Sequence, residues 1–521
     1  MKITEYSKND TLIVKGCAII LIMLHNLYRW ITPITGENEF DFSTGNFSNF
    51  INCLQNTPLD FINIIFSFLG HFGVQAFILF SGYGLTKSFL SKETTWIQFS
   101  TSHIKKVFVL LLLGIVTYYA TQPIFQQQIT LINDIKSIPL LLLFVHTLTP
   151  DTGTMICGPW WFLGLIVQLY LIFPLIVNLT KRFGKITLLF ITIISYIIFY
   201  TSLFILNNDN GIYITQNAPA HLPEFCLGIW LALTKEKKNN IIWLVLALIV
   251  FCLGNVYEIF YPLTFISVCI IFVFIYQLIK DSKFRNNKTT NAIKFIGSIS
   301  MLLFITHGFI RTPFLNFNEY LCDITEYNII IGIIIGLLYI ICCVLFAIIT
   351  KPIYNQLCKL FNKIHLPRLV IKHEKFIFII MLLFFSYITL FYSTTIIKDE
   401  KELNSNINSK EIVFYTNGTT SQHTEFSSVL TMKQKWTNQI VFNVEFDAKC
   451  NNGNMPLLVF ESNISWSKFK LEPSDTLRHY SFKENISIPF YSPINNKVKI
   501  YFWNNSGSEF EFQNFSIRYS N

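Results

Sequence analysis

The sequence predicts an α-helical polytopic membrane protein of about eleven spans, followed by a C-terminal β-sandwich outside the membrane. Of its 521 residues, 52% are apolar and only 14% are charged, whereas soluble globular proteins carry about 25% charged residues. Apolar runs of roughly 17–23 residues, long enough to cross ~30 Å of hydrocarbon, recur from residue 11 to residue 397. Beyond residue 398 these runs stop and short alternating segments begin.

The apolar runs give the expected spans in order. The run at 138–148 is too short to cross and is interpreted as a re-entrant or interfacial segment. The other runs are predicted to cross at residues 11–31, 61–85, 106–122, 160–179, 186–206, 219–234, 241–256, 260–279, 294–312, 328–350 and 376–397.

The charges of the connections predict the orientation. The connection 32–60 contains acidic residues but no Lys or Arg, whereas the connections that follow residues 85, 179, 234, 279 and 350 are basic. Because Lys and Arg concentrate in cytoplasmic loops, eleven crossings place the N-terminus in the cytoplasm and the C-terminal domain outside. The net charge of +9 resides in these loops, since residues 398–521 contain thirteen basic and thirteen acidic residues. This distribution argues against nucleic-acid binding.

The C-terminal part has the pattern of half-buried strands. Ile440, Phe442, Val444 and Phe446 alternate with residues of the opposite face, a period of two. Several such strands over ~110 residues favour a sandwich. We therefore expect a membrane domain at 1–397, a linker at 398–411 and a β-sandwich at 412–521. Two interpretations stay open for the tryptophans of this part, a sugar-stacking surface or packing in the core. The residues are Trp436, Trp466 and Trp503.

Ionisable side chains inside spans are costly, so each is a candidate functional group. His25 and His307 lie in the outer halves of spans that run outward, His71 lies near the middle of its span, and His221 and Glu224 lie in the outer half of another. A buried imidazole is a suitable general base near neutral pH. For His25 a hydrogen bond between packed helices is the simpler alternative.

Five segments in order across about 300 residues carry a family resemblance. They are Lys15-Gly16 followed by apolar residues and His25, Gly73-Val74 followed by Ser81-Gly82-Tyr83, Pro159-Trp160-Trp161-Phe162-Leu163, Pro223-Glu224-Phe225-Cys226-Leu227-Gly228, and Ser300 to His307. Together they resemble the acyltransferase-3 family, multi-pass membrane enzymes that O-acylate cell-surface and secreted glycans. Two positions differ from the family pattern: Asn26 occupies the usual place of the first His, and Lys105-Lys106 replaces an Arg.

The resemblance implies an acyl-CoA donor, most simply acetyl-CoA, from the cytoplasm and a glycan or lipid-linked glycan acceptor on the outer side of a bacterial cytoplasmic membrane. It implies catalytic roles for His25 and His307, and no bound cofactor or metal is expected. Cations at the inner face suit the phosphates of CoA by charge. The donor-binding candidates are Lys15, Lys105, Lys106 and Ser81, and the candidates that line the acceptor site are Asn26, His71, Trp161 and Glu224.

Simpler explanations exist for several of these residues. Lys15 could be an interfacial anchor that snorkels, Trp161 part of an aromatic belt, and Ser81 a site of close helix packing. Two other classes of function stay open as well. One is a proton-coupled glycan or lipid flippase, and the other is a glycan-binding protein tethered to the membrane.

Overall fold

The computed structural model describes residues 2–363, apart from short gaps at 4, 92–93, 125–133, 135–136, 150–151, 207–211, 235–236, 239–240, 282–286 and 325–328, and the strands between 412 and 520. The described chain divides into two compact units, one helical and one built of strands. The expected span 376–397 and the expected linker 398–411 lie outside the described residues, so the predicted domain bounds stay predictions.

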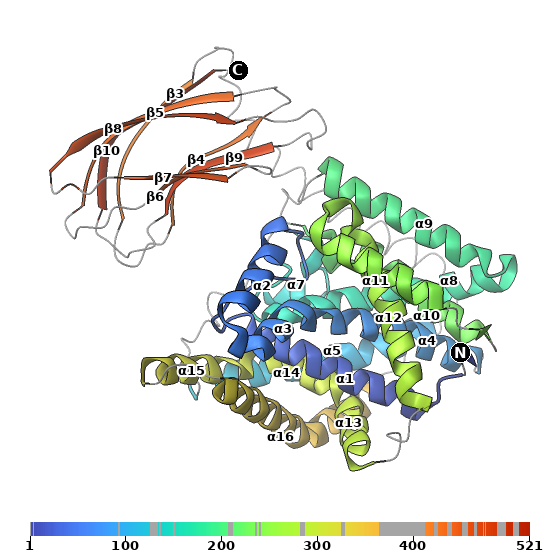
Figure 1. Cartoon of the computed structure of the whole chain (residues 1–521). Helices are drawn as coiled ribbons and strands as arrows, with labels where there is room; N and C mark the ends of the chain where they lie inside the picture. Colours follow the sequence, from blue (N-terminus) through green and yellow to red (C-terminus); the bar gives the residue numbers. More distant parts are fainter. Residues whose placement is uncertain are drawn as a thin grey trace. The chain divides into compact units, whose positions relative to one another are not determined.

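Apart from a short antiparallel pair, β1 (Lys2–Ile3) and β2 (Lys237–Lys238), helices make up the first unit (Figure 1). Their bounds are α1 (Lys8–Tyr28), α2 (Thr44–Asn56), α3 (Phe61–Leu69), α4 (Gly73–Leu90), α5 (Trp96–Thr121), α7 (Ile138–Leu142), α8 (Trp161–Phe183), α9 (Ile186–Thr201), α10 (Ala218–Leu233), α11 (Ile241–Val256), α12 (Tyr261–Asp281), α13 (Lys288–Ser298), α14 (Ser300–Ile310), α15 (Thr312–Ile324) and α16 (Ile329–Asn362). Short 3-10 turns include η2 (Gly70–Phe72) and η3 (His146–Leu148).

Seven segments of the described chain are long and apolar enough to cross a bilayer, and the pair α13 and α14, bent by 80°, is an eighth candidate. α10 and α11 have 16 residues each, or ~24 Å of helix at 1.5 Å per residue. The chain is thus a membrane protein, and the count of eleven spans stays a prediction. The seven segments are Lys8–Tyr28, Pro58–Leu90, Trp96–Thr121, Gly158–Phe183, Ile186–Phe204, Glu258–Leu278 and Ile331–Asn362.

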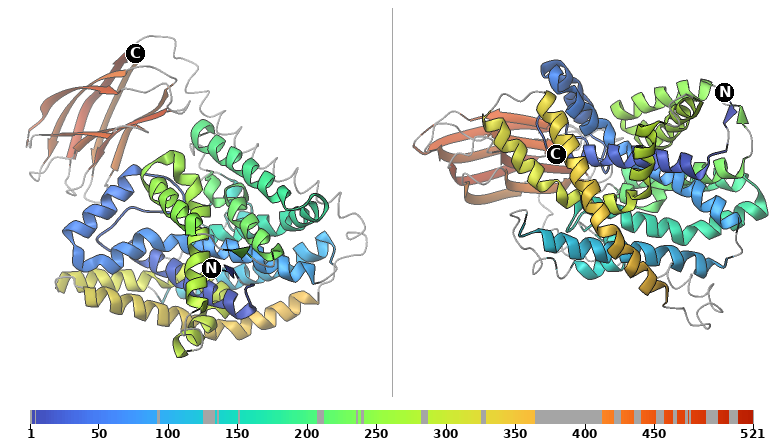
Figure 2. Two further views of the ribbon diagram at one scale, coloured as in Figure 1. Left: turned by 45° about the vertical axis from the view of Figure 1, so that its right-hand side comes forward. Right: turned by 90° about the horizontal axis from the view of Figure 1, so that it is seen from below.

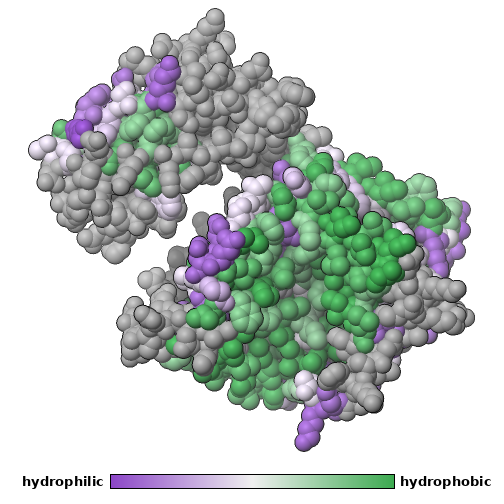
Figure 3. Space-filling model, viewed as in Figure 1, coloured by the Kyte–Doolittle hydropathy of each residue, from purple (hydrophilic) through white to green (hydrophobic). Residues whose placement is uncertain are grey.

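The outer surface of the helical unit is apolar. Figure 3 shows a broad hydrophobic surface with hydrophilic residues at its margins. On α9 and α11 most large apolar side chains are exposed, Phe190, Ile197, Ile242 and Trp243 among them. Such a surface is stable only against hydrocarbon, because water would meet it at a high free-energy cost.

α1 lies in the interior of this unit, among α3, α4, α13 and α14, as Figures 1 and 2 show. Its start is fixed by a capping box in which the Ser7 hydroxyl accepts from the Asp10 backbone N–H and the Asp10 carboxylate accepts from that of Ser7. Gly16 allows close approach, since a Cβ there would overlap Ile293 of α13. The buried position of α1 brings its last turn into the centre of the protein.

The second unit consists of two four-stranded antiparallel sheets. One has the order β3-β10-β5-β8 and the other β4-β9-β6-β7. The expected alternation at 440–446 falls in β5, where Val444 and Phe446 are fully buried. Phe446 contacts Phe502 of β9 with ring centroids 5.2 Å apart, so apolar faces of the two sheets meet. The bounds are β3 (Ile412–Thr420), β4 (Phe426–Gln434), β5 (Ile440–Cys450), β6 (Leu457–Ser462), β7 (Trp466–Lys470), β8 (Arg478–Ile486), β9 (Asn496–Trp503) and β10 (Phe510–Ser520).

Candidate functional site

His25 lies in the last turn of α1 and is almost completely buried. Its Nδ1 atom is 2.9 Å from the backbone carbonyl of Ser67 in α3. Because a carbonyl oxygen only accepts, Nδ1 carries a proton and donates it. In the neutral ring the lone pair is therefore on Nε2, which lies 3.5 Å from Oε2 of Glu39. This Nε2 atom is buried and has no hydrogen-bond partner in the described chain.

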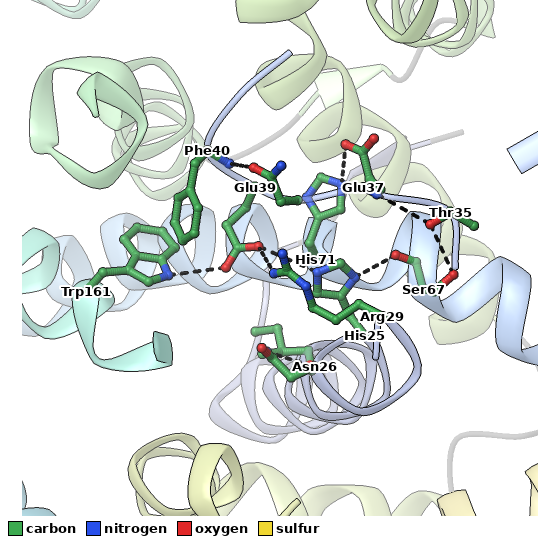
Figure 4. A network of polar contacts seen from close by, with 12 residues as sticks. His25, Asn26, Arg29, Thr35, Glu37, Glu39, Phe40, Ser67, His71 and Trp161 are labelled. Atoms are coloured by element: carbon green, nitrogen blue, oxygen red, sulfur yellow. Dashed lines mark hydrogen bonds and ion pairs between the residues drawn. The ribbon is translucent and has the colours of Figure 1, made fainter. Parts of the chain in front are cut away.

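Glu39 belongs to the connection between α1 and α2. Arg29 donates to its Oε2 atom at 3.3 Å, and the Trp161 indole donates to its Oε1 atom at 3.3 Å (Figure 4). Burial alone would raise the pKa of the Glu39 carboxyl, but a hydrogen bond from His25 when its ring is protonated and the charge of Arg29 outweigh it and hold the pKa well below its ordinary value. Glu39 is therefore an anion at neutral pH, and its Oε2 atom lies 3.5 Å from Nε2 of His25.

A second histidine–glutamate pair lies alongside the first. Nε2 of His71 is 3.5 Å from Oε1 of Glu37, and the rings of His71 and His25 have centroids 5.3 Å apart. Gly70 makes this approach possible, since a Cβ there would lie 2.6 Å from the Leu21 carbonyl oxygen of α1. Figure 4 shows both pairs beneath the same connection.

The connection that carries both glutamates is held at several points. It turns at Gly36, whose φ of 80° suits a residue without Cβ. The Thr215 hydroxyl donates to the Phe40 carbonyl at 2.8 Å, and the Phe40 ring packs edge-on against Trp161 at 5.6 Å. The spacing of Glu37 and Glu39 then directs both carboxylates to the two imidazoles.

His307 occupies the corresponding place in α14, in its last turn, and is fully buried. Its Nδ1 donates to the backbone carbonyl of Phe304 at 2.8 Å. Nε2 is buried without a partner in the described residues. Like His25, it is a buried imidazole with its proton fixed on Nδ1 and its lone pair on Nε2.

Asn26 faces a different direction from His25. Its amide donates to the Ile22 carbonyl at 3.0 Å, and Arg311 of α14 donates to its carbonyl oxygen at 3.2 Å and to its Oδ1 atom at 3.4 Å. In this chain the histidine stands one residue earlier than in the family pattern. The His25 imidazole therefore contacts Glu39 and His71, and the Asn26 amide does not.

Glu224 reaches the site indirectly. Its Oε1 atom is 3.0 Å from Nδ1 of His221, whose Nε2 atom is 2.8 Å from the Thr215 carbonyl. The His221 ring stacks on Trp161 with centroids 6.3 Å apart and 26° between the ring planes. Glu224 therefore supports Trp161, which in turn binds Glu39.

The comparison with protein families decides the class of this site. A family model described as the acyltransferase domain matches residues 13–351, about two thirds of the chain. The chain belongs to the acyltransferase-3 family. Members of this family transfer acyl groups other than aminoacyl groups, so the predicted enzyme class is confirmed. Neither the curated proteins nor the solved structures gave a match.

In this acyltransferase the donor-binding candidates lie away from the paired histidines. Lys15 precedes His25 by ten residues of α1, ~15 Å along the axis, and Ser81 of α4 follows His71 of η2 by ten residues of chain. Lys105 and Lys106 are on α5, and the described contacts do not include them among the neighbours of His25 or Glu39. Their assignment stays a prediction.

The acyltransferase has a cavity of about 550 Å³ where α4 and α8 end and α5 begins. None of the four donor-binding candidates lines it. Its lining residues are Phe89, Leu90, Ser91, Thr94, Thr95, Asn178 and Lys181. Within the described part of the chain, no three His, Cys, Asp or Glu residues are arranged to hold a metal ion.

Glu37 and Glu39 are site residues that the sequence analysis does not single out. In the sequence they are two of the acidic residues of a connection predicted to face outward. A usable signal was present, because two carboxylates at a spacing of two residues follow the candidate histidine closely. Carboxylates are frequent partners of catalytic imidazoles.

Proposed function

We propose that this membrane acyltransferase moves an acetyl group from cytoplasmic acetyl-CoA to a hydroxyl of an envelope or lipid-linked glycan. The arrangement of His25 against Glu39 supports it most directly. Nε2 of His25 offers a lone pair for the acceptor proton, and the ionised Glu39 stabilises the imidazolium that forms. The environment is buried, so this charge interaction is stronger than in water.

The reaction then needs no further co-reactant. The acceptor oxygen attacks the thioester carbonyl carbon, a C–O bond forms and the C–S bond breaks. The proton taken by His25 passes to the sulfur of the departing CoA. His307 supplies a second buried imidazole with a free Nε2 atom for the same group transfer, while Asn26, His71, Trp161 and Glu224 shape the acceptor site.

The proposed topology separates the two substrates. The N-terminus and the basic loops lie in the cytoplasm of a bacterial cell, and eleven spans carry the chain to an outer β-sandwich formed by the two sheets. Lys15, Lys105 and Lys106 then face the phosphates of CoA, Ser81 lines the path, and the paired histidines lie toward the glycan. The acidic connection and the basic loops support this polarity.

The experiment uses radiolabelled acetyl-CoA, the purified protein and a glycan fraction from the cell envelope. We expect label on the glycan, and His25→Ala should reduce the rate by about 10²–10⁴-fold, the usual contribution of a general base. His103→Ala is the matched control, because the hydrogen bonds of His103 within the described part of the chain, to Phe99 and Ser102, stay inside its own helix α5. Undiminished transfer in His25→Ala would exclude the role, and label that stays on CoA would favour the flippase.

A further inference from the structure

The last turns of α1 and α14 share a motif whose second arginine takes no part in the proposed proton transfer. In α1, His25 is followed four residues later by Arg29, and in α14, His307 is followed four residues later by Arg311. Each arginine is the C-cap of its helix, just beyond the end of the apolar segment. Since Arg311 bonds Asn26, the two helix ends lie together. The motif therefore places two guanidinium groups beside the two buried imidazoles.

Both guanidinium groups lie over one aromatic ring. The Arg29 guanidinium carbon is 5.7 Å from the ring centroid of Trp30, and that of Arg311 is 5.5 Å from the same ring. Trp30 is 55% exposed, although it directly follows a buried helix. The exposed face of the indole is a surface on which a sugar ring can stack. The two guanidinium groups beside it supply hydrogen-bond donors for an anion.

The two arginines differ in their counter-ions. Glu39 pairs with Arg29 at 3.3 Å, and Glu37 lies against His71. In the described chain no carboxylate lies within ion-pair distance of Arg311, whose guanidinium donates to neutral oxygens of Asn26. A guanidinium has five donor hydrogens, and a partly buried charge without a counter-ion is costly. Arg311 is thus a cation with donors to spare beside the reactive histidines.

We propose that Arg311, together with Arg29 and Trp30, binds an anionic group of the acceptor, so that the enzyme prefers glycans bearing a phosphate or a carboxylate near the hydroxyl that is acylated. Guanidinium groups bind both of these anions through two parallel hydrogen bonds. The proposal rests on the proposed function in one respect, because it takes the acceptor to be a glycan that meets His25 from the side of the acidic connection.

A purely structural role for Arg311 predicts something different. By bonding the Asn26 carbonyl near the end of α1, Arg311 satisfies a helix C-terminus and joins α1 to α14. In that case its loss weakens the protein or slows transfer to every acceptor alike. It leaves the ratio between anionic and neutral ligands unchanged.

The test measures binding of three sugars to the purified full-length protein by saturation-transfer NMR: glucose 1-phosphate, glucuronate and methyl glucoside. We expect the anionic sugars to bind at least about tenfold more tightly than the neutral one, the ratio given by one charge-assisted hydrogen bond. Arg311→Gln should abolish this preference, and Arg311→Lys should keep part of it. Arg182→Gln is the matched control, since Arg182 lies over Phe183 at the end of α8.

Each outcome decides the proposal. Three results would overturn it. They are equal binding of neutral and anionic sugars, no binding of the anionic sugars, and a preference for anionic sugars that survives in folded Arg311→Gln. A preference for one anionic sugar identifies phosphate or carboxylate as the group recognised. Transfer of labelled acetate by wild type and by His25→Ala is measured in parallel. An anion preference without any dependence of transfer on His25 would contradict the proposed function and leave the anion site standing.

Discussion

At the scale of single residues, the charge of Glu39 follows from its neighbours. A buried carboxyl ordinarily becomes neutral. Here the Arg29 guanidinium and the Trp161 indole N–H donate to the Glu39 carboxylate, and Nε2 of His25 lies 3.5 Å from it. The pKa of Glu39 is held well below the ordinary value by these contacts despite burial. The anion is thus a permanent part of the site over the physiological pH range.

Glu39→Gln tests the need for this negative charge. Gln keeps the shape and can still accept from Trp161, but it cannot stabilise an imidazolium at His25. We expect kcat for acetyl transfer to fall by roughly 10²-fold, within the usual range for acid–base groups. Glu445→Gln in β5 serves as the control. Unchanged kcat in Glu39→Gln would show that His25 needs no counter-ion.

The same substitution has a pH-dependent effect on stability. Since the folded-state pKa of Glu39 lies below the unfolded value of about 4.3, ionised Glu39 stabilises the fold above that pH, and the contribution is lost as the pH falls toward the folded-state pKa. The difference in Tm between wild type and Glu39→Gln should be full at pH 7 and shrink below about pH 4. A constant difference down to pH 3 would contradict the assigned charge.

At the scale of elements, α4 and α10 pack through glycine. A Cβ at Gly228 of α10 would overlap the Leu79 carbonyl of α4, and one at Gly82 of α4 would overlap the Phe225 carbonyl of α10. Small residues allow membrane helices to approach this closely. The contact holds Glu224 of α10 in place, and through His221 it supports Trp161.

Gly228→Ala should therefore separate the two helices. We expect a loss of stability of about 1–3 kcal/mol, the usual cost of overpacking, measured as a lower Tm of the detergent-solubilised protein. Gly84→Ala is the control on α4, because a Cβ there meets nothing within 4 Å. That variant should be unchanged or slightly more stable, since Ala is a better helix former. Equal effects of the two substitutions would argue against the close packing.

The sequence predicts the helices and the histidines better than it predicts their partners. His25 and His307 are costly in apolar helices, and this cost alone marks them. Glu37 and Glu39 lie on a connection whose path depends on a hydrogen bond between Phe40 and Thr215, 175 residues apart. No local pattern encodes such a contact. The strand alternation at 440–446 was sufficient to predict β5, because a period of two is a local property.

At the scale of the whole molecule, single cysteines can report the predicted orientation in the membrane. Cys53 lies in α2, within the acidic connection predicted to face outward, and Ser91 follows α4 at the predicted inner face. A variant with Cys53 as its single cysteine should react with a membrane-impermeant maleimide in intact cells. A second variant with only Ser91→Cys should react after permeabilisation alone. The reverse pattern would invert the whole topology and the proposed placement of donor and acceptor.

The connection from residue 32 to residue 42 also bears on how such an enzyme can diversify. The imidazoles of His25 and His71 belong to buried helical segments whose substitutions disturb many neighbours at once, whereas Glu37 and Glu39 belong to a short irregular stretch. Substitutions at the other positions of that stretch change the surface beside Glu37 and Glu39 while the reacting groups keep their register. Evolution, or a protein engineer, can thus vary the stretch around these two carboxylates and leave the transmembrane scaffold intact.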